Sequence, residues 1–337
     1  MHYLVTGHTG FKGAWLCMLL KSRGHQVSGI SLDPVDNSLF DRANVSELLE
    51  NDIRLDIRND ESLKLAISKI APDVVMHLAA QPLVRYSYRE PRETFETNVN
   101  GTLNVLEAVQ TTPTVKACLV ITTDKVYRNV NQAEGYVETD ALGGDDPYSA
   151  SKAMADLLTQ SWVKSFPGVP TAIARAGNVI GGGDVCEDRL IPDVVRAFSS
   201  GTPLHIRYPN AVRPWQHVLD CLNGYLTLVD NLLIGKGQGE WNFGPGIESF
   251  VPVGKMAEVS QTMWQAPTEV VVDGTPTLHE ANLLALDSTK AHSSLGWNNK
   301  LVFPQSLEWT LTWEQEVLAG SNVRETCESQ LARFEAL

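Results

Sequence analysis

The chain has 337 residues, of which 43% are hydrophobic and 20% are charged. These values are typical of a folded globular protein with two domains, or with one large domain and a lobe. The net charge of −13 excludes a general nucleic-acid-binding surface, because phosphate backbones require clustered cations.

The five cysteines and the hydropathy pattern predict a cytoplasmic protein without a membrane partner. The cysteine count is odd and no pair has metal-site spacing, so we expect reduced thiols and no bound metal. A strand begins almost at the N-terminus, where a signal peptide would need a long apolar region. No apolar run approaches the roughly eighteen residues of a membrane span.

A glycine-rich loop follows the first predicted strand, His2–Val5, and precedes a helix that begins near Ala14. Gly7 permits a tight turn, Gly10 lets a pyrophosphate approach the backbone, and Gly13 lets the helix lie close to the sheet. The helix N-terminus offers free amides to a phosphate. This arrangement predicts a dinucleotide site. The residues that we assign to it are Gly7, Thr9, Gly10, Phe11, Lys12 and Gly13.

The next two predicted strands end in polar groups that would face the adenosine half of a dinucleotide. An acid that binds the ribose is expected about twenty residues past the glycine loop. Ser31 stands at that place and Asp33 follows two residues later. No arginine directly follows this strand to bind a 2′-phosphate, which favours NAD over NADP. At the third strand end, Asp56 and its neighbour Ile57 are expected to reach the adenine.

An apolar strand is predicted at Asp73–Ala80, and its composition is typical of a parallel sheet covered on both faces. We expect His77 within it to be a satisfied core histidine. The small side chains after the strand let a cofactor lie close to the backbone. Arg85, in a predicted loop over Gln81–Tyr88, is a candidate substrate contact. The cofactor contacts assigned here are Leu78, Ala79, Ala80 and Gln81.

Two later segments, Thr94–Gln110 and Ser149–Phe166, have the apolar periodicity of helices that pack on a sheet. Trp162 and Val163 extend the apolar surface beyond one stripe. This leaves room for a dimer formed by the two helices.

The stretch Leu119–Lys152 carries the predicted chemistry. A buried strand, Leu119–Ile121, ends abruptly in hydroxyls, an acid and a base. Such an ending places polar groups at the carboxyl edge of an open sheet, where ligands bind. Tyr148 and Lys152 are four residues apart, so they share a helix face. A cation there would lower the phenol pKa from about 10, so that a phenolate can take a proton from a sugar hydroxyl.

A sixth strand at Thr171–Arg175 and a second glycine-rich crossing at Ala176–Asp184 complete the pattern. Strands that alternate with helices predict an α/β fold with a doubly wound parallel (Rossmann) sheet and right-handed crossovers. We assign residues 1–176 and about 218–245 to an NAD-binding domain. Residues at about 177–217 and 246–337 would form a smaller α/β substrate lobe.

The predicted lobe is rich in groups that bind anions. A helix is expected to begin near Pro192, and Leu204–Arg207 is a short predicted strand. Arg189 and Arg213 suit a diphosphate, because a guanidinium makes paired hydrogen bonds with phosphate oxygens. Trp241–Gly244 is expected to return to the main sheet.

These residues together resemble the extended short-chain dehydrogenase/reductase group, and within it the sugar-nucleotide 4,6-dehydratases that act on CDP-glucose. The motifs that carry the resemblance are Thr6–Leu16, Ala79–Arg85, Thr123–Lys125, Arg175–Asp184 and Arg213–Val218. The dehydratases of dTDP-glucose have Thr-Asp-Glu where this chain has Thr123, Asp124 and Lys125. The lysine favours the CDP-sugar branch.

The resemblance implies a redox-neutral dehydration of CDP-D-glucose to CDP-4-keto-6-deoxy-D-glucose, with NAD kept in the site. Tyr148, paired with Lys152, would take the proton of the 4-hydroxyl while Thr123 hydrogen-bonds its oxygen. Lys125 would remove the hydrogen at carbon 5, provided that burial neutralises its ammonium, and Asp124 would protonate the departing 6-hydroxyl.

The resemblance also implies contacts and an assembly. Asn98 and Thr122 join the cofactor site. The implied substrate contacts are Arg85, Asn178, Arg189, Leu190, Arg207, Arg213 and His279. A homodimer or a dimer of dimers is expected, with a place in deoxysugar synthesis such as that of lipopolysaccharide O-antigen.

Three alternatives stay open. The first is a 4,6-dehydratase of dTDP- or GDP-hexoses. The second is a nucleotide-sugar 4-epimerase, which shares the fold, the cofactor and the Tyr148–Lys152 pair but performs no elimination. The third, of a different class, is a catalytically silent NAD-binding protein, against which the intact residues Thr123–Lys125 argue.

Overall fold

A seven-stranded sheet forms the centre of the computed structural model, which describes residues 1–132, 134–274 and 284–337. All its strands are parallel, in the order β10-β6-β5-β4-β1-β2-β3. They are β1 (His2–Thr6), β2 (Gln26–Ser31), β3 (Asn51–Arg54), β4 (Val74–His77), β5 (Ala117–Ile121), β6 (Thr171–Ala176) and β10 (Gly239–Phe243). This doubly wound order confirms the predicted fold class.

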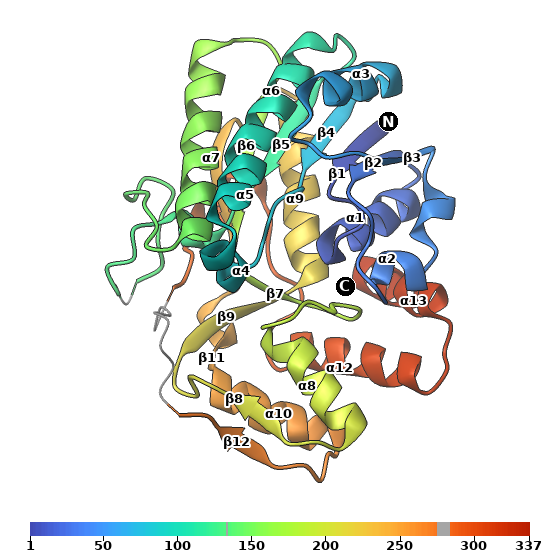
Figure 1. Ribbon diagram of the computed structural model, residues 1–337, viewed down its shortest axis with the longest axis vertical. Helices are drawn as coiled ribbons and strands as arrows, with labels where there is room; N and C mark the ends of the chain where they lie inside the picture. Colours follow the sequence, from blue (N-terminus) through green and yellow to red (C-terminus); the bar gives the residue numbers. More distant parts are fainter. Residues whose placement is uncertain (133, 275–283) are drawn as a thin grey trace.

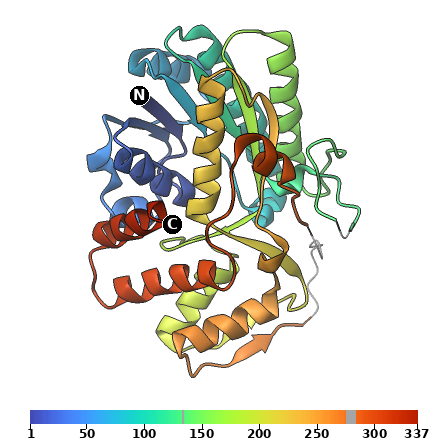
Figure 2. The same ribbon diagram turned by 180° about the vertical axis from the view of Figure 1, so that it is seen from behind.

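Helices cover both faces of the sheet because successive strand residues point to opposite sides. Leu4 packs with one hydrophobic cluster, and its neighbours Tyr3 and Val5 pack with the other. In Figure 1, α3 (Asp60–Ile70), α6 (Gly101–Thr111) and α7 (Pro147–Ser165) lie on the near face. Figure 2 shows the opposite face, covered by α1 (Phe11–Ser22) and α9 (Val218–Leu233).

A smaller lobe lies beyond the carboxyl ends of the strands, below the sheet in Figure 1. Its strands are β7 (Asn178–Ile180), β8 (Leu204–Ile206), β9 (Val212–His217), β11 (Phe250–Pro252) and β12 (Val270–Val272). They form one three-stranded sheet, β11-β9-β7, and one pair, β12-β8. Its helices are α8 (Leu190–Ser200), α10 (Val253–Trp264) and α12 (Gln305–Leu318). The lobe has its own core, which includes Phe198, Trp215 and Met256.

The chain returns from the lobe to the main sheet at β10, which pairs with β6 and confirms the predicted return at Trp241. The last helix, α13 (Val323–Glu335), contacts α1, and its Phe334 shares the core cluster of Tyr3. The domain limits remain a prediction, and this contact favours counting α13 with the sheet. None of the helices that the structure describes is long and apolar enough to cross a membrane.

One local prediction is wrong, and a second is confirmed except for a π turn within the predicted helix. The segment expected to be a loop over Gln81–Tyr88 contains α4 (Val84–Arg89). The single helix expected over Thr94–Gln110 is divided into α5 (Pro91–Phe95), a π-helical turn at Glu96–Asn100 and α6. The π turn inserts a residue into the helical repeat, and Asn98 within it is buried. The remaining short elements are α2 (Leu39–Arg42), η1 (Val45–Leu48), η3 (Asp124–Val126), η4 (Ile247–Ser249) and α11 (Thr289–Leu295).

Candidate active site

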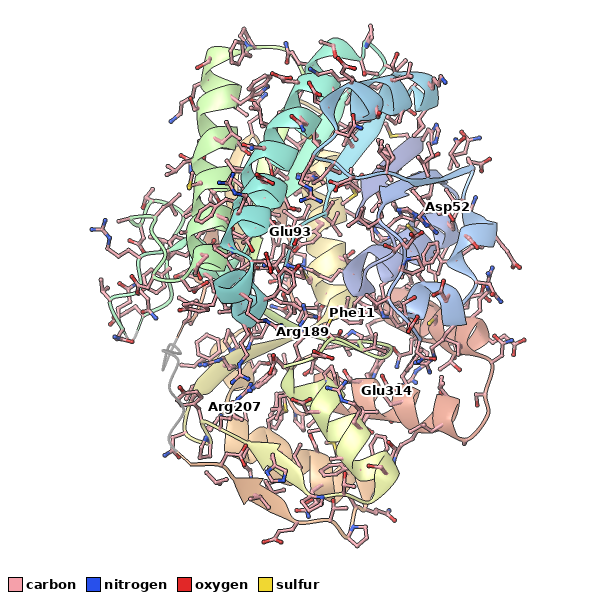
Figure 3. All side chains as sticks on the ribbon, in the orientation of Figure 1. Phe11, Asp52, Glu93, Arg189, Arg207 and Glu314 are labelled. Carbon is pink, nitrogen blue, oxygen red and sulfur yellow. The ribbon has the colours of Figure 1, made fainter. Side chains whose placement is uncertain are left out.

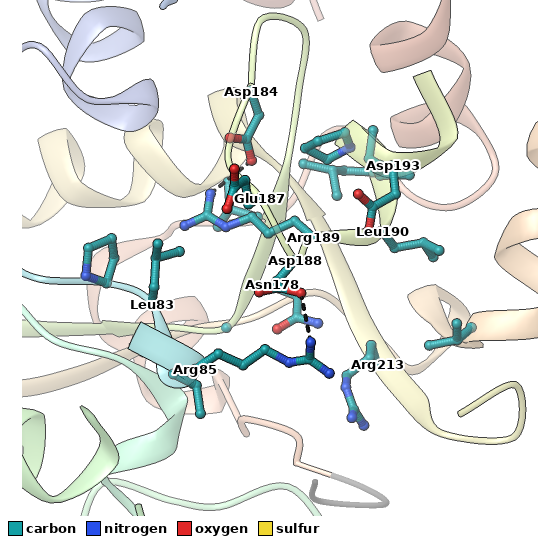
Figure 4. A pocket seen from close by; sticks show the side chains of 18 of the residues that line it. Leu83, Arg85, Asn178, Asp184, Glu187, Asp188, Arg189, Leu190, Asp193 and Arg213 are labelled. Carbon is teal, nitrogen blue, oxygen red and sulfur yellow. Dashed lines mark hydrogen bonds and ion pairs between the residues drawn. The ribbon is translucent and has the colours of Figure 1, made fainter. Parts of the chain in front are cut away.

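A cavity of about 810 Å³ lies between the carboxyl edge of the sheet and the lobe. Figure 3 shows Phe11 from the sheet side and Arg189 from the lobe side at this junction, and Figure 4 shows the cavity from close by. The predicted site residues that line it are Thr122, Thr123, Asp124, Lys125, Tyr148, Phe11, Lys12, Arg85, Asn178, Arg189, Leu190, Arg207 and Arg213. The structure therefore brings residues of the sheet domain and residues of the lobe together around one cavity. His279 lies outside the described residues.

The acid–base couple stands where β5 ends and the short turn η3 begins. The Asp124 side chain is 2% exposed and that of Lys125 is 33% exposed. Lys125 Nζ donates to Asp124 Oδ1 over 3.1 Å, and the Thr123 hydroxyl donates to the same oxygen over 2.8 Å. Burial lowers the pKa of Lys125, but the Asp124 carboxylate and Tyr148 outweigh it and raise the pKa above its ordinary value. The couple is thus an ion pair, whereas the sequence predicts that burial neutralises the lysine.

Tyr148 and Lys152 share the inner face of α7, as their spacing predicts, and both are buried. Asp146 caps this helix by accepting a hydrogen bond from the Ser149 amide over 2.9 Å. Lys152 Nζ donates to the carbonyl oxygen of Ile121 over 2.7 Å. The lysine is therefore anchored to the end of β5, directly before the couple.

The predicted direction of the Tyr148 pKa is wrong in this structure. Burial raises the pKa of Tyr148, and the opposing influences are the Lys125 ammonium and a hydrogen bond with Thr123. Burial and the nearby Lys12 ammonium lower the pKa of Lys152 to about 7. Lys152 thus carries only part of a charge near neutral pH, which explains why it does not supply the expected cation.

The glycine loop forms a cradle that side chains would fill. Gly7 has φ +75°, and a Cβ there would lie 2.7 Å from the Ala79 nitrogen. A Cβ on Gly13 would lie 2.2 Å from the Gly7 oxygen, whereas one on Gly10 would meet only that oxygen, at 3.4 Å. Gly10 begins α1 without a capping side chain, and the first turn has no acidic residue. The exposed first-turn amides therefore suit the pyrophosphate of a dinucleotide.

An arginine lies beside the predicted ribose site, contrary to the expectation from sequence neighbours. Thr9 and Ser31 join their hydroxyls over 2.7 Å at the end of β2. The parallel register places Arg54 of β3 next to Ser31. Arg54 Nε lies 3.4 Å from Asp33, and its other guanidinium nitrogens bind Asp52. Two carboxylates thus offset the charge that would otherwise attract a 2′-phosphate.

The remaining predicted cofactor residues are held by contacts within the protein. Asn98 accepts a hydrogen bond from the Gln81 amide over 2.8 Å and donates to the Ser151 hydroxyl over 2.9 Å. Thr122 donates to the buried carboxylate of Asp156 over 3.0 Å. These bonds join the segment after β4, the end of β5 and α7 into one floor. Of the others, Leu78, Ala79 and Ala80 follow β4, Ile57 is buried, and Asp56 pairs with Arg58 over 2.6 Å.

Asp184 and Asp188 pair with arginines that are predicted to contact the substrate, and neither aspartate is predicted from the sequence. Asp184, which is 5% exposed, lies 2.8 Å from Arg189. Asp188 lies 3.1 Å from both Arg85 and Arg207. The alternation of acids and arginine between positions 184 and 189 was the only signal in the sequence.

Glu314 of α12, a further residue that is not predicted from the sequence, fixes the glycine-rich crossing Ala176–Asp184 that leads into the lobe. Its Oε1 accepts a hydrogen bond from the Gly183 amide over 2.7 Å. On the other side, Trp15 Nε1 donates to the Gly182 oxygen over 2.9 Å. Burial raises the pKa of Glu314 to about 7 against this hydrogen bond. The crossing is thus held between α1 and α12.

Known proteins resemble this chain over nearly all of its length. The family model described as GDP-mannose 4,6 dehydratase matches residues 4–310. A CDP-glucose 4,6-dehydratase from Salmonella typhimurium is 42% identical over 330 residues, which covers 95% of this chain and 92% of that protein. A dTDP-glucose 4,6-dehydratase from Xanthomonas campestris is 28% identical and covers 95% of this chain and 96% of that protein.

Solved structures share the fold. A UDP-glucose 4-epimerase from Thermotoga maritima matches with a TM-score of 0.84 at 24% identity, covering 94% of this chain and 100% of that one. A dTDP-glucose 4,6-dehydratase from Streptomyces venezuelae, solved with NAD bound, matches with a TM-score of 0.81 at 24% identity, covering 94% and 97%.

Proposed function

The chain belongs to the GDP-mannose 4,6-dehydratase family of the extended short-chain dehydrogenases/reductases, and from this membership we propose that it converts CDP-D-glucose to CDP-4-keto-6-deoxy-D-glucose. The protein is thus an NAD-dependent hydro-lyase. The observation that carries the proposal is the Asp124–Lys125 couple, which faces the same cavity as Tyr148. Oxidation alone would need only Tyr148 and Lys152, whereas elimination of water needs an acid and a base as well.

The glycine cradle and the amides of α1 would hold the pyrophosphate of NAD, with Ser31 and Asp33 on the adenosine side. NAD, when bound there, would supply the hydride chemistry that the reaction requires at carbons 4 and 6 of the sugar. The floor formed by Asn98 and Thr122 keeps this region in place. Their own polar groups are satisfied inside the protein.

Tyr148 is the proposed base for the 4-hydroxyl. Burial raises the pKa of the phenol, so the protein must favour its ionised form by a nearby positive charge and a donated hydrogen bond. The Lys125 ammonium supplies the charge, and the Thr123 hydroxyl supplies the hydrogen bond once it turns from Asp124 to Tyr148. Lys152, on the same face of α7, binds the Ile121 carbonyl and so fixes the helix against the strand end.

Elimination across carbons 5 and 6 follows from the Asp124–Lys125 couple. Once the phenol has taken the substrate proton, Lys125 passes its own proton to Asp124 along the hydrogen bond that joins them. The neutral Lys125 amine then takes the proton from carbon 5, and the protonated Asp124 gives its proton to the leaving hydroxyl, which departs as water. The couple then carries the charges of the ion pair found in the structure. Lys125 gives its proton back to carbon 5 when hydride returns to carbon 6.

This cycle leaves Tyr148 with one proton more and the Asp124–Lys125 couple with one fewer than at its start. The Thr123 hydroxyl donates to Asp124 over 2.8 Å and also hydrogen-bonds Tyr148. It therefore offers a path of two hydrogen bonds that returns the proton from the phenol to the carboxylate.

Mass spectrometry of the product tests the proposal. Purified protein is incubated with the CDP-, dTDP-, UDP- and GDP-hexoses in turn. We expect CDP-glucose to lose the mass of one water, with little conversion of the other three. A product of unchanged mass with inverted carbon 4 would favour the 4-epimerase, whose fold this chain shares. Bound NAD without turnover of any sugar would favour a silent binding protein.

We also propose a homodimer that buries the outer faces of α6 and α7. Met154 and Leu157 of α7 are 48% and 52% exposed, which is unusual for large apolar side chains on one helix. Val99 and Leu103 are only half-buried on the adjoining helical segment. Sedimentation should give a dimer for the native chain and a monomer for Leu157→Asp. A native monomer would contradict this assembly.

A further inference from the structure

The two aspartates of the segment between β7 and α8 hold their arginines in different ways. The side chain of Asp184 is 5% exposed and pairs with Arg189 alone, while its other oxygen accepts the Cys186 amide over 3.1 Å. The Asp188 side chain is 40% exposed, and its single oxygen Oδ1 contacts two arginines. Asp184 is therefore a buried structural partner, whereas Asp188 can exchange its contacts with a solute.

Asp188 joins the two sides of the cavity. Its Oδ1 lies 3.1 Å from Nη1 of Arg85, on α4 of the sheet domain, and 3.1 Å from Nη1 of Arg207, directly after β8 of the lobe. Figure 4 shows Asp188 above Arg85, joined to it by a dashed line, with Arg189 above Asp188 and Arg213 to the right of Arg85. All three residues of this bridge line the cavity. One anionic oxygen thus lies between two cations that come from opposite walls.

The backbone supports a special role for this position. Asp188 has φ +59°, in the left-handed region that residues other than glycine seldom adopt. Such conformations persist where the surroundings fix them, and they gather at functional sites. The contacts of Asp188 with Arg85 and Arg207 supply that constraint. The side chain is thereby held over the cavity.

An oxygen between two guanidinium groups is also the arrangement that binds a phosphate. We propose that Asp188 occupies the place of a phosphate oxygen of the nucleotide sugar, and that the diphosphate displaces it from Arg85 and Arg207 on binding. The inference rests on the proposed function, which supplies the diphosphate substrate. Asp188 is then an internal competitor that weakens the binding of diphosphates and joins sheet domain to lobe until one arrives.

A supporting role for Asp188 predicts a change in anion affinity of the opposite sign. If Asp188 stayed on the two arginines in the complex and only oriented them, its loss would weaken anion binding. If Asp188 competes with the diphosphate, its loss strengthens anion binding, because an incoming anion no longer has to displace the Asp188 carboxylate from the two arginines. The sign of one binding change therefore separates competition from support.

Calorimetric titration of Asp188→Asn with inorganic pyrophosphate and with CDP tests the inference. Asparagine tolerates the left-handed backbone as aspartate does, so we expect the variant to fold with the thermal midpoint of the native chain. Both ligands should bind about three- to tenfold more tightly than to the native chain, as expected for the release of two exposed ion pairs. Equal or weaker binding of pyrophosphate would overturn the inference.

A matched control removes the same charge from the same lobe. Asp193 also lines the cavity but pairs with Arg196. Asp193→Asn should change pyrophosphate binding by less than about twofold, since neither Arg85 nor Arg207 is released. Equal strengthening by both variants would show a general charge effect and would overturn the inference.

Two further arms keep this inference separate from the proposed function. Cytidine, which has no phosphate, should bind equally to the native chain and to Asp188→Asn, and tighter binding of cytidine would contradict displacement by phosphate. Turnover of CDP-glucose by the native chain tests the proposed function alone. If CDP-glucose is not turned over, the pyrophosphate titration still decides whether Asp188 competes.

Discussion

The two walls of the cavity are built in different ways. The cofactor wall consists of backbone in close contact, where a Cβ on Gly7 or Gly13 would lie within 3 Å of neighbouring atoms. The substrate wall consists of charged side chains that are about one-third exposed, such as Arg85, Arg189 and Arg207. The cofactor wall leaves no room for added atoms at Gly7 and Gly13, whereas the charged groups of the substrate wall can form ion pairs with other partners.

This difference explains how one protein can hold a cofactor tightly and still release a product. A cofactor that stays bound through the reaction suits a wall without spare volume. A substrate that must enter and leave suits a wall whose ion pairs are worth little and re-form quickly. The Asp124–Lys125 couple lies where the walls meet, with the acid buried and the base partly exposed. Variants at each place test whether the two walls differ in this way.

The largest effect is expected at the couple itself. Lys125→Met should lower product formation about 10³-fold, because it removes the base for carbon 5. Hydride abstraction should be slower, because Tyr148 loses the nearby Lys125 charge, yet a single turnover should still give the absorbance of reduced nicotinamide. Exchange of the carbon-5 hydrogen with solvent deuterium, followed by mass spectrometry, should stop.

The control for this variant is Lys116→Met, whose ammonium is paired with Asp73 over 2.7 Å and is not among the residues that line the cavity. It should leave turnover and exchange at native rates. Undiminished exchange in Lys125→Met would remove this lysine from its proposed role.

The next prediction distinguishes two roles of the glycine loop, which are close packing within the protein and the binding of NAD. Gly13→Ala should lower the free energy of unfolding by about 1–3 kcal/mol, because its Cβ would overlap the Gly7 oxygen. Gly10→Ala should cost less than about 1 kcal/mol, since its Cβ meets only one atom, at 3.4 Å. NAD should nevertheless bind at least about tenfold more weakly to Gly10→Ala, where the pyrophosphate is expected.

Urea unfolding and NAD titration of both glycine variants measure this difference. Equal destabilisation by the two substitutions would show that the whole loop is packed alike. The cradle would then not be open at Gly10.

A pH-dependent effect of similar size is expected at Glu314, which holds the crossing between the walls. Its pKa of about 7 in the folded chain exceeds the ordinary 4.5, so the folded state binds this proton more tightly than the unfolded state. Its contribution is fully present below about pH 4.5 and is lost as the pH rises through 7. Over this range the native chain should lose up to about 3 kcal/mol more unfolding free energy than Glu314→Gln does.

Urea unfolding at pH 5 and pH 8 gives the comparison, with Glu316→Gln on the exposed side of α12 as the control. The control should follow the native pH dependence. Parallel pH curves for the native chain and Glu314→Gln would show that Glu314 ionises normally.

The smallest effect concerns the choice between NAD and NADP. Asp33→Asn removes one of the two carboxylates that offset Arg54, and the Asp33 side chain is 89% exposed. NADP should bind about threefold more tightly and NAD slightly more weakly, which is the scale of an exposed ion pair. Asp36→Asn, a nearby exposed change of the same charge, should alter neither affinity. Titration of both cofactors would contradict the argument if Asp33→Asn left their ratio unchanged.

Much of the fold and of the cavity could be predicted from the sequence. Apolar runs such as Leu119–Ile121 are buried strands, and the polar groups that follow them lie at the carboxyl edge, because parallel strands end together. His77 is the satisfied core histidine expected, since it joins Thr6 and Thr102 over 2.7 and 3.1 Å. Spacing on α7 placed Tyr148 and Lys152 on one buried face.

The rest depends on neighbours that the sequence does not order. Arg54 reaches Asp33 only through the register of β2 with β3. The π turn at Asn98 has the same apolar stripe as a regular helix, so periodicity could not predict it. The raised pKa of Tyr148 comes from its burial, which the spacing of residues along α7 does not show. The shared contact of Asp188 requires two elements from opposite walls.

The late return of the chain at β10 has a consequence for synthesis on the ribosome. When the first 176 residues have emerged, β6 is an outer strand with an open row of hydrogen-bonding groups, and β10 covers it only more than sixty positions later. An uncovered strand of this kind can pair with a foreign chain. The nascent protein therefore passes through an interval of vulnerability, which ends only when β10 has been translated.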